Sequence, residues 1–278
     1  MTTTRFAPSP TGLLHLGHAY AALFAANRAG EKGRFLVRLE DIDQTRSKPE
    51  YEESIFTDLD WLGLSWEKPV LRQSDDLRYY QTGLDKLNQL GVLYPCFCTR
   101  REIQQEIMSA GQAPHGPDGP LYPGTCRQLN AAEREQRLTA GAPHALRLDV
   151  QRASSLVKAQ LTWKDRIHGQ FVVNPGIYGD VVLARKDIAV GYHLAVVMDD
   201  ARQGVTLVTR GVDLLPATHL HRLLIELLEL PVPEWEHHLL IVDEHGKRLA
   251  KRDNARSLKS MREHGWSAEQ LRSKIGLE

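Results

Sequence analysis

The chain has 278 residues, of which 42% are hydrophobic and 25% charged, which is ordinary for a globular protein with one large domain or two modest ones. Its 35 Lys and Arg residues equal its 35 Asp and Glu residues, so a nucleic-acid binder that relies on a strongly positive global charge is excluded. The N-terminus has no apolar signal core, and no run of 18 apolar residues follows, which favours a cytoplasmic protein.

Strand-like and helix-like segments alternate through the first third of the chain. The pattern predicts strands at 5–7 and 35–39, and helices over 19–28, 52–62 and 77–90. Alternation of this kind is typical of a parallel, Rossmann-like sheet.

The middle of the chain has a different composition. Residues 111–125 are dense in Gly and Pro, which predicts a loop, and residues 144–190 hold several short β-like runs. Ordered α/β sequence resumes with a helix over 192–200, a strand at 206–209 and a helix over 217–230. An insertion of roughly 100 residues is therefore expected to split one nucleotide-binding domain.

The segment His15-Leu16-Gly17-His18 follows the first predicted strand and opens a helix. Two imidazoles three residues apart share one helix face, and a helix N-terminus attracts phosphate. Gly17 allows a ligand to approach the backbone. These features suit an ATP molecule whose α-phosphate is attacked, although two surface histidines at a helix start explain the isolated pattern equally well.

The segment from Gly246 to Arg252 reads GKRLAKR. Flexible cations beside a nucleotide can neutralise the charge that builds on a departing pyrophosphate. Taken alone, the segment is better explained as a solvated basic loop.

The three cysteines are clustered between Cys96 and Cys126, and an odd, clustered set argues against a disulfide framework. Cys96, Cys98 and Cys126 with the phenolate of Tyr122 could form a tetrahedral, structural zinc site that fixes the Gly/Pro-rich loop. His115 is a competing fourth ligand from spacing alone.

Several motifs occur in one order: RFAPSPTG from Arg5, the His15–His18 segment, LEDID from Leu39, Arg210-Gly211 and the second cation segment. This set resembles the catalytic domain of glutamyl-tRNA synthetases, class I enzymes with "HIGH" and "KMSKS" signatures, from Arg5 to about Arg252. The second signature departs from the family pattern, because Arg248 replaces the first Lys and Ala250 replaces the Ser. Lys251 stands where the second Lys of the family falls.

The resemblance implies two sets of ligands in one active site. An arginine fork can hold a carboxylate, a glutamate an ammonium group and a tyrosine hydroxyl can donate a hydrogen bond. The implied glutamate-binding residues are Arg5, Phe6, Ala7, Pro8, Ser9, Glu40, Tyr192 and Arg210. The implied ATP-binding residues are His15, Gly17, His18, Arg248 and Lys251, with His15, His18 and Lys251 catalytic and Mg²⁺ accompanying the triphosphate.

Only 26 residues follow Arg252, so no anticodon-binding domain is expected. This shortness and the C-x-C…Y-x3-C pattern resemble the glutamyl-Q tRNA(Asp) synthetases, which favours Tyr122 as the fourth zinc ligand. The resemblance implies tRNA-independent activation of L-glutamate by ATP and its transfer to the queuosine of tRNA(Asp), with neither membrane nor DNA as a partner. Two alternatives are a glutamate ligase that charges a tRNA 3′ end or a small acceptor, and a non-catalytic RNA-binding relic.

The expected fold class is α/β, a class I synthetase Rossmann-like parallel sheet split by an inserted α+β, acceptor-binding-like zinc subdomain. We expect the first half of the catalytic domain at residues 1–95 and the inserted zinc-containing subdomain at 96–190. The second half is expected at 191–242, and the KMSKS-like loop with a short C-terminal helical segment at 243–278.

Overall fold

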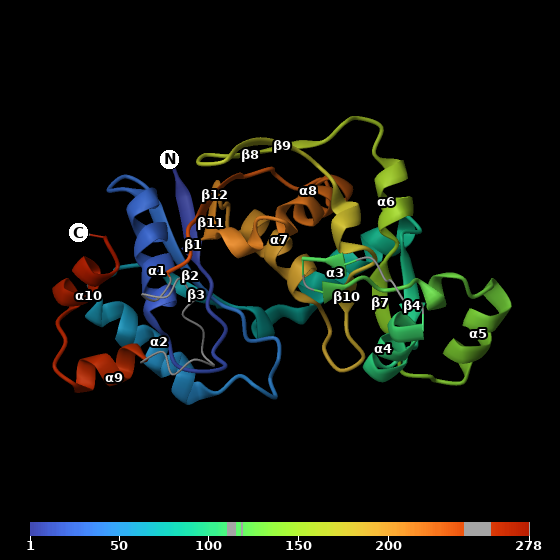
Figure 1. Cartoon of the computed structure of the whole chain (residues 1–278), viewed down its shortest axis with the longest axis horizontal. Helices are drawn as coiled ribbons and strands as arrows, with labels where there is room; N and C mark the ends of the chain where they lie inside the picture. Colours follow the sequence, from blue (N-terminus) through green and yellow to red (C-terminus); the bar gives the residue numbers. More distant parts are fainter. Residues whose placement is uncertain (110–114, 118, 242–256, 278) are drawn as a thin grey trace.

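The computed structural model describes residues 1–109, 115–117, 119–241 and 257–277. The N-terminal part is a parallel sheet in the order β1-β2-β3. Helix α1 follows β1, and α2 follows β2 (Figure 1). The elements are β1 (Thr3–Phe6), α1 (Leu16–Ala29), β2 (Arg34–Leu39), α2 (Pro49–Trp61) and β3 (Glu67–Arg72).

A second set of parallel strands lies beside β1. The backbone N–H of Thr206, which precedes β11, donates to the carbonyl of Thr3 at 3.0 Å, and β11 pairs in parallel with β12. Strands β1 and β11 are therefore neighbours at the centre of the parallel sheet, with helices following each of them along the chain. The second set comprises α3 (Leu77–Gln89), α7 (Tyr192–Arg202), β11 (Leu207–Gly211), α8 (Ala217–Leu228) and β12 (Glu234–His238).

The sequence explains why these strands are central. Five of the six residues of β2 are buried, as expected for a parallel strand that is covered on both faces. One apolar cluster joins α1, α2, β1 and β2, and a second joins α3, α7, α8, β11 and β12. The expected α/β class and Rossmann-like parallel sheet are confirmed.

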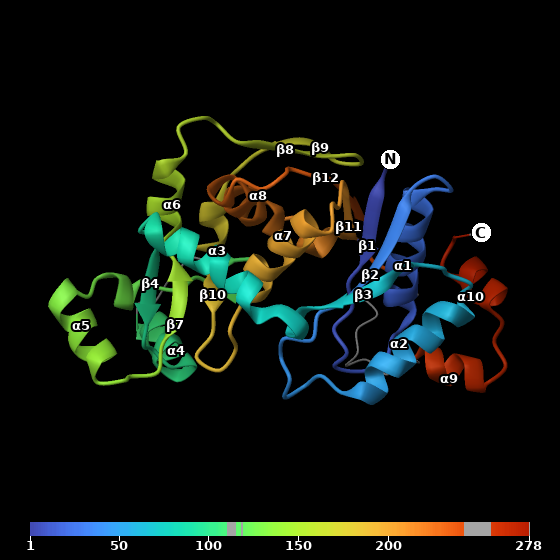
Figure 2. The same ribbon diagram turned by 180° about the vertical axis from the view of Figure 1, so that it is seen from behind.

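The residues between α3 and α7 form a smaller antiparallel sheet in the order β10-β7-β4, far from the N- and C-termini (Figure 2). Short helices and a two-residue strand pair surround it. These elements are β4 (Leu93–Cys96), α4 (Arg100–Ser109), β5 (His115–Gly116), β6 (Gly119–Pro120), α5 (Ala131–Thr139), β7 (Ala145–Leu148), α6 (Val150–Leu156) and β10 (Val182–Ala184).

One hairpin from this stretch joins the parallel sheet instead. Strands β8 (Thr162–Asp165) and β9 (Gly169–Val172) are antiparallel, and β8 runs parallel to β12 with Asp165 opposite Trp235. The 96–190 segment thus supplies the edge of the parallel sheet and two strands of the smaller sheet, β7 and β10, whereas β4 begins before it, at Leu93. The division of the chain into domains stays a prediction.

The C-terminal residues form two short helices, α9 (Leu258–Glu263) and α10 (Ala268–Lys274), where the sequence led us to expect one. Leu258, Met261 and Leu271 are buried in the same cluster as α1 and α2. This packing brings the end of the chain back to the helices α1 and α2 beside the N-terminal strands. Within the described ranges, none of the helices is both long and apolar enough to cross a membrane.

Candidate active site

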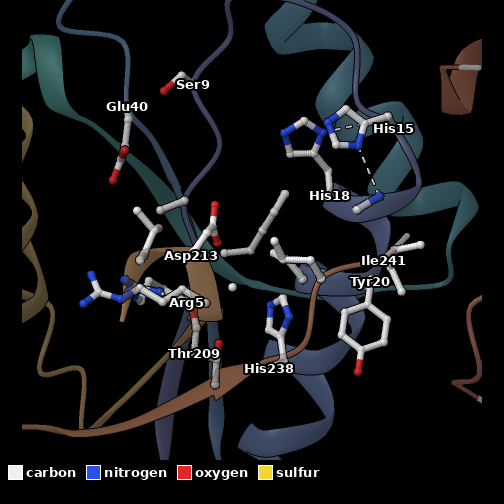
Figure 3. Close-up of a pocket in the computed structure, with 18 of the residues that line it drawn as sticks. Arg5, Ser9, His15, His18, Tyr20, Glu40, Thr209, Asp213, His238 and Ile241 are labelled. Carbon is white, nitrogen blue, oxygen red and sulfur yellow. Dashed lines mark hydrogen bonds between the residues drawn. The ribbon is translucent and has the colours of Figure 1, made fainter. Parts of the chain in front are cut away.

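A cavity of about 440 Å³ opens where β1 and β11 end (Figure 3). The connections from these adjacent strands lead in different directions, and ligands of open α/β sheets bind at this kind of position. The cavity collects most of the site residues predicted from sequence: Arg5, Phe6, Ala7, Ser9, His15, Gly17, His18, Glu40, Tyr192 and Arg210. Pro8 is buried and does not line the cavity.

Arg5, on β1, is a buried arginine whose charge is balanced inside the protein. Its Nε donates to Asp200 Oδ1 at 2.9 Å, and its Nη1 donates to the backbone carbonyl of Thr209 at 2.9 Å. Burial opposes ionisation of Asp200, but Arg5 and Arg38 outweigh it and hold the pKa of that carboxyl below its usual range. Arg5 therefore meets an anion before any ligand binds.

Arg210, on β11, is buried without such a balance. Its Nε donates to His237 Nε2 at 3.0 Å, its Nη1 to His221 Nδ1 at 3.1 Å and its Nη2 to Thr218 Oγ1 at 2.7 Å. In the described part of the chain, it has no carboxylate as an ion-pair partner. Burial, with Arg5 nearby, lowers the pKa of Arg210, although Tyr192 and Asp200 act in the opposite direction. A buried cation of this kind favours an anionic ligand.

Glu40 follows β2 and presents its carboxyl group to the same cavity. Burial raises its pKa to about 7, although Arg38 and Arg5 act in the opposite direction. The nearest Arg38 nitrogen is 3.5 Å from Glu40 Oε1. A cationic group bound beside Glu40 would favour the ionised carboxylate, so this position suits an ammonium ion.

Tyr192 begins α7 and is 39% exposed. It lines the first cavity and also a second cavity of about 900 Å³, whose other walls come mainly from the smaller sheet and the cysteine cluster. A side chain shared by both cavities is placed to contact ligands in each of them.

His15 and His18 form a reciprocal cap at the start of α1. The Gly17 N–H donates to His15 Nδ1 at 3.1 Å, and the His15 N–H donates to His18 Nδ1 at 3.2 Å. Because each Nδ1 accepts a backbone proton, the neutral form of each ring carries its own proton on Nε2. The centroids of the two rings are 3.8 Å apart, so the cap holds both imidazoles together at the start of α1.

The lack of a side chain at Gly17 leaves room for the His15 ring in that cap. A Cβ atom at this position would lie 3.1 Å from His15 Cε1 and 3.3 Å from His15 Nδ1. The expectation that Gly17 admits a ligand to the backbone is therefore refined, because the His15 ring already occupies the space beside it.

Arg248 and Lys251 lie outside the described residues. The residues on either side of that segment are described, and both lie at the site. Ile241 lines the cavity, and Ser257 forms a β-bridge with His15.

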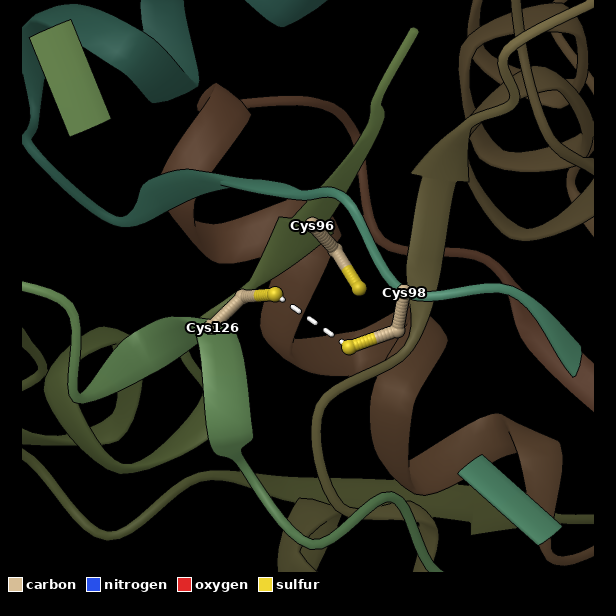
Figure 4. A group of neighbouring side chains, drawn as sticks. All are labelled: Cys96, Cys98 and Cys126. Atoms are coloured by element: carbon tan, nitrogen blue, oxygen red, sulfur yellow. Dashed lines mark hydrogen bonds between the residues drawn. The ribbon is translucent and has the colours of Figure 1, made fainter. Parts of the chain in front are cut away.

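The three cysteines converge beside the smaller sheet (Figure 4). Their sulfur atoms lie within 4.8 Å of one another, and Cys98 Sγ is 3.3 Å from Cys126 Sγ. The Tyr122 hydroxyl is 3.4 Å from Cys96 Sγ and 3.5 Å from Cys98 Sγ. Sulfur ligands of a tetrahedral zinc ion, each about 2.3 Å from the metal, would lie roughly 3.8 Å apart, so the set fits a metal centre.

Neighbouring groups act differently on the ligand atoms of this cluster. Burial opposes ionisation of Cys126, but hydrogen bonds outweigh it and lower the pKa of that thiol, whereas burial and the bonds with the cysteines raise the pKa of Tyr122. The Cys126 N–H donates to Tyr122 Oη at 2.9 Å, the Phe97 N–H donates to Cys126 Sγ at 3.3 Å, and Arg147 lies 3.8 Å over the Tyr122 ring. Burial raises the pKa of the Cys98 thiol to about 11, so a bound metal ion would have to displace its proton. The side chain of the competing ligand, His115, is not described.

Sequence reasoning missed several residues of the site. The cavity is also lined by Tyr20, Thr209, Asp213, His238 and Ile241. Asp213 comes two residues after Gly211, the last residue of β11, so its place just after a strand end is the one signal that could have found it. Asp200 and His237, the partners of the two arginines, can be identified only once the packing of the strands and helices is known.

A catalytic unit with a parallel sheet, a histidine pair at a helix start and a cavity between the two central strands defines the class I aminoacyl-tRNA synthetase type of ligase. Residues 1–277 match the family described as tRNA synthetases class I (E and Q), catalytic domain, and the chain belongs to this family. The resemblance inferred from the motifs is thereby confirmed.

Individual proteins of this family are similar to the chain in sequence and in structure. The chain is 49% identical to a Glutamyl-Q tRNA(Asp) synthetase of Rhodobacter capsulatus, over 99% of both chains. It is 40% identical to a Glutamate–tRNA ligase of Aquifex aeolicus, over 96% of this chain and 55% of the relative. A crystal structure of the glutamate–tRNA synthetase of Elizabethkingia anophelis superposes with a TM-score of 0.76 at 30% identity, covering 95% of this chain. The chain spans about half the length of these last two proteins, 55% and 54% respectively.

Proposed function

We propose that the chain activates L-glutamate with ATP, without a tRNA present, and transfers the glutamyl group to the queuosine of tRNA(Asp). The observation that carries the activation step is the buried Arg210, which has no carboxylate partner in the described structure and shares a cavity with Glu40 and the histidine pair. A dicarboxylic amino acid supplies the missing anion to Arg210 and an ammonium group to Glu40.

The residues at the two ends of the cavity bind different substrates. Glutamate binds between Arg210, Arg5, Tyr192 and Glu40, against the backbone of residues 5–9. At the other end, His15 and His18 donate Nε2–H groups to the phosphates or ribose of ATP, beside Gly17. Arg248 and Lys251 act on the same triphosphate, and the described neighbours of their segment, Ile241 and Ser257, support this placement.

The chemistry is an attack by a glutamate α-carboxylate oxygen on the α-phosphorus of ATP. Pyrophosphate leaves, and glutamyl-adenylate forms. Mg²⁺ bound with the triphosphate would neutralise part of its charge. Lys251 stabilises the charge of the transition state by electrostatics, and no side chain becomes covalently attached. A hydroxyl group of the acceptor then attacks the mixed anhydride and releases AMP.

The acceptor reaches the adenylate through the second cavity, which shares Tyr192 with the first. The choice of queuosine in tRNA(Asp) rests on the name of the Rhodobacter capsulatus relative, which this chain matches from end to end. Zinc held by Cys96, Cys98, Cys126 and Tyr122 stabilises the wall of that second cavity.

Two measurements test the proposal. ATP–pyrophosphate exchange without tRNA should depend on L-glutamate, and labelled glutamate should attach to tRNA(Asp) that contains queuosine but not to the same tRNA without it. Exchange that ignores glutamate would refute the activation step. Glutamate attached to the 3′ end of the unmodified tRNA would refute the acceptor and favour the alternative of a 3′-end ligase.

A further inference from the structure

Arg210 is surrounded by nitrogen and oxygen acceptors rather than by anions. Its three protein bonds use groups from two elements: His237 on β12, and Thr218 and His221 on α8. The parallel pairing sets Arg210 opposite His237 in register, and Thr218 and His221 are three residues apart, on one face of α8. The guanidinium is therefore fixed by the fold on two sides.

Because arginine has N–H groups and no acceptor, it determines which nitrogen of each histidine carries a proton. His237 accepts from Arg210 at Nε2, so its own proton is on Nδ1, where it donates to Asp165 Oδ2 at 2.6 Å. His221 accepts at Nδ1, so its proton is on Nε2 and points to His193 Nδ1, 3.1 Å away. Each ring then has one donor and one acceptor in use.

Asp165, at one end of this series of hydrogen bonds, is itself fixed by bonds from the backbone. Asp165, on β8, accepts from the backbone N–H groups of Ile167, His168 and His237 at 2.8 to 3.0 Å. Burial opposes ionisation of Asp165, but the bonds from His237 and these N–H groups outweigh it and lower its pKa. Burial, with Arg210 nearby, lowers the pKa of His193 to about 4 and that of His237 to about 3, so both rings are neutral near pH 7.

The hydrogen-bond partners of Arg210 carry no negative charge, and this affects how Arg210 can interact with a ligand. These partners fix the direction of the Arg210 guanidinium without a carboxylate from the described residues in contact with it, whereas Arg5 is paired directly with Asp200. The three bonds use three of the five N–H groups of Arg210, so two N–H groups are left for a ligand carboxylate and for Tyr192.

We propose that His221 and His237, held by His193 and Asp165, are positioning residues that aim the uncompensated charge of Arg210 at the side-chain carboxylate of the amino acid and so select it over a carboxamide. This inference rests on the proposed activation of glutamate. It assigns specificity to residues that lie behind the cavity wall and do not line the glutamate cavity themselves.

The test exploits the different nitrogens that Arg210 uses. An asparagine at position 221 places its oxygen near the former Nδ1, whereas a glutamine places it near the former Nε2. His221→Asn should therefore preserve the bond to Arg210 and His221→Gln should lose it, although the two variants are equally polar. For position 237 the order reverses, and His237→Gln is the preserving variant.

ATP–pyrophosphate exchange is measured with glutamate and with glutamine, and rates are normalised to the adenylate formed in one turnover. We expect His221→Gln and His237→Asn to raise the KM for glutamate about 10- to 100-fold. Their kcat and KM for ATP should stay within about threefold of the wild type, and their preference for glutamate over glutamine should fall. The preserving variants should stay within about threefold of the wild type throughout.

His219→Asn is the matched control, because His219 lies on the same helix and accepts instead from Trp163 and the Asn174 N–H. An unchanged KM for glutamate in His221→Gln, or equal defects in the two variants at position 221, would overturn the positioning roles while leaving glutamate activation intact. Absence of glutamate-dependent exchange in the wild type would refute the proposed function itself.

Discussion

Arg5 and Arg210 stand at the ends of adjacent strands, line one cavity and are both buried, yet their surroundings differ. Arg5 meets the ionised Asp200, whereas Arg210 meets two neutral histidines and a threonine. Burial alone therefore does not tell which arginine binds a ligand, because a paired cation can simply be part of the scaffold. The arginine whose counter-charge is missing from the protein indicates what the ligand must supply.

Replacing the unbalanced arginine should have the largest effect. We expect Arg210→Gln to lower kcat/KM for glutamate by roughly 10²- to 10³-fold, since a buried charge pair with the substrate is lost. ATP–pyrophosphate exchange measures this. Arg222→Gln is the control, because Arg222 lies on α8 and pairs with Glu226 at 2.9 Å, outside the cavity. A loss no greater than that of the control would remove Arg210 from the substrate site.

The phosphate end provides the next largest effect. Lys251→Ala should slow ATP–pyrophosphate exchange by about 10²-fold, because one preorganised charge at the transition state is removed. Glutamate binding, followed by calorimetry, should be nearly unchanged, and Lys259→Ala on α9 provides the control. Exchange at the wild-type rate would exclude Lys251 from the mechanism.

Protonation of Glu40 should make glutamate affinity depend on pH. Its pKa is raised to about 7 in the free protein, so the group is largely neutral below pH 7 and ionised above it. Binding of an ammonium group needs the ionised form, so glutamate affinity should rise with pH and level off above about pH 7. Below that pH, affinity should fall up to about tenfold per pH unit.

Calorimetry in buffers of different ionisation enthalpy would detect the proton released on glutamate binding near pH 6.5. In Glu40→Gln, the release should vanish and the affinity should be weaker but independent of pH. A proton release that persists in this variant would assign the titration to another group.

The cysteine cluster tests whether the second cavity depends on a metal. Removing the metal with a chelator, or Cys98→Ser, should lower the midpoint of thermal unfolding by several degrees, because the closed loop loses its link. Glutamate-dependent exchange should fall less than transfer to tRNA(Asp). Elemental analysis reports the metal, and re-addition of zinc should restore the unfolding midpoint of the chelated wild type. Unchanged stability after complete metal removal would contradict a structural metal.

The smallest effect is expected at the helix start. Gly17→Ala should push the His15 ring away from its cap and raise the KM for ATP about 3- to 10-fold, with the KM for glutamate unchanged. Steady-state exchange at varied ATP separates the two constants. An unchanged KM for ATP would show that the position of the His15 ring does not matter for the nucleotide.

Sequence reasoning predicted the parts of the site that follow strand ends and local motifs. Arg5, Glu40 and Arg210 each come at or just after the end of a parallel strand, and such ends meet at one edge of a sheet. The spacing of the cysteines between Cys96 and Cys126 likewise predicted a cluster, and the structure brings these residues together.

What the sequence could not provide depends on register and packing. The pairing of Arg210 with His237 needs the alignment of β11 and β12, and the contact between His237 and Asp165 needs β8 at the sheet edge. The β8–β9 hairpin lies within a stretch whose neighbours belong to another sheet, so periodicity alone gives no reason to place it beside β12.

A crystal structure with L-glutamate tests the central claim most directly. The account predicts the side-chain carboxylate of glutamate within hydrogen-bonding distance of Arg210, with His221 and His237 still bonded to that guanidinium and the ammonium group beside Glu40. A carboxylate held elsewhere, with Arg210 turned to a protein carboxylate, would contradict it.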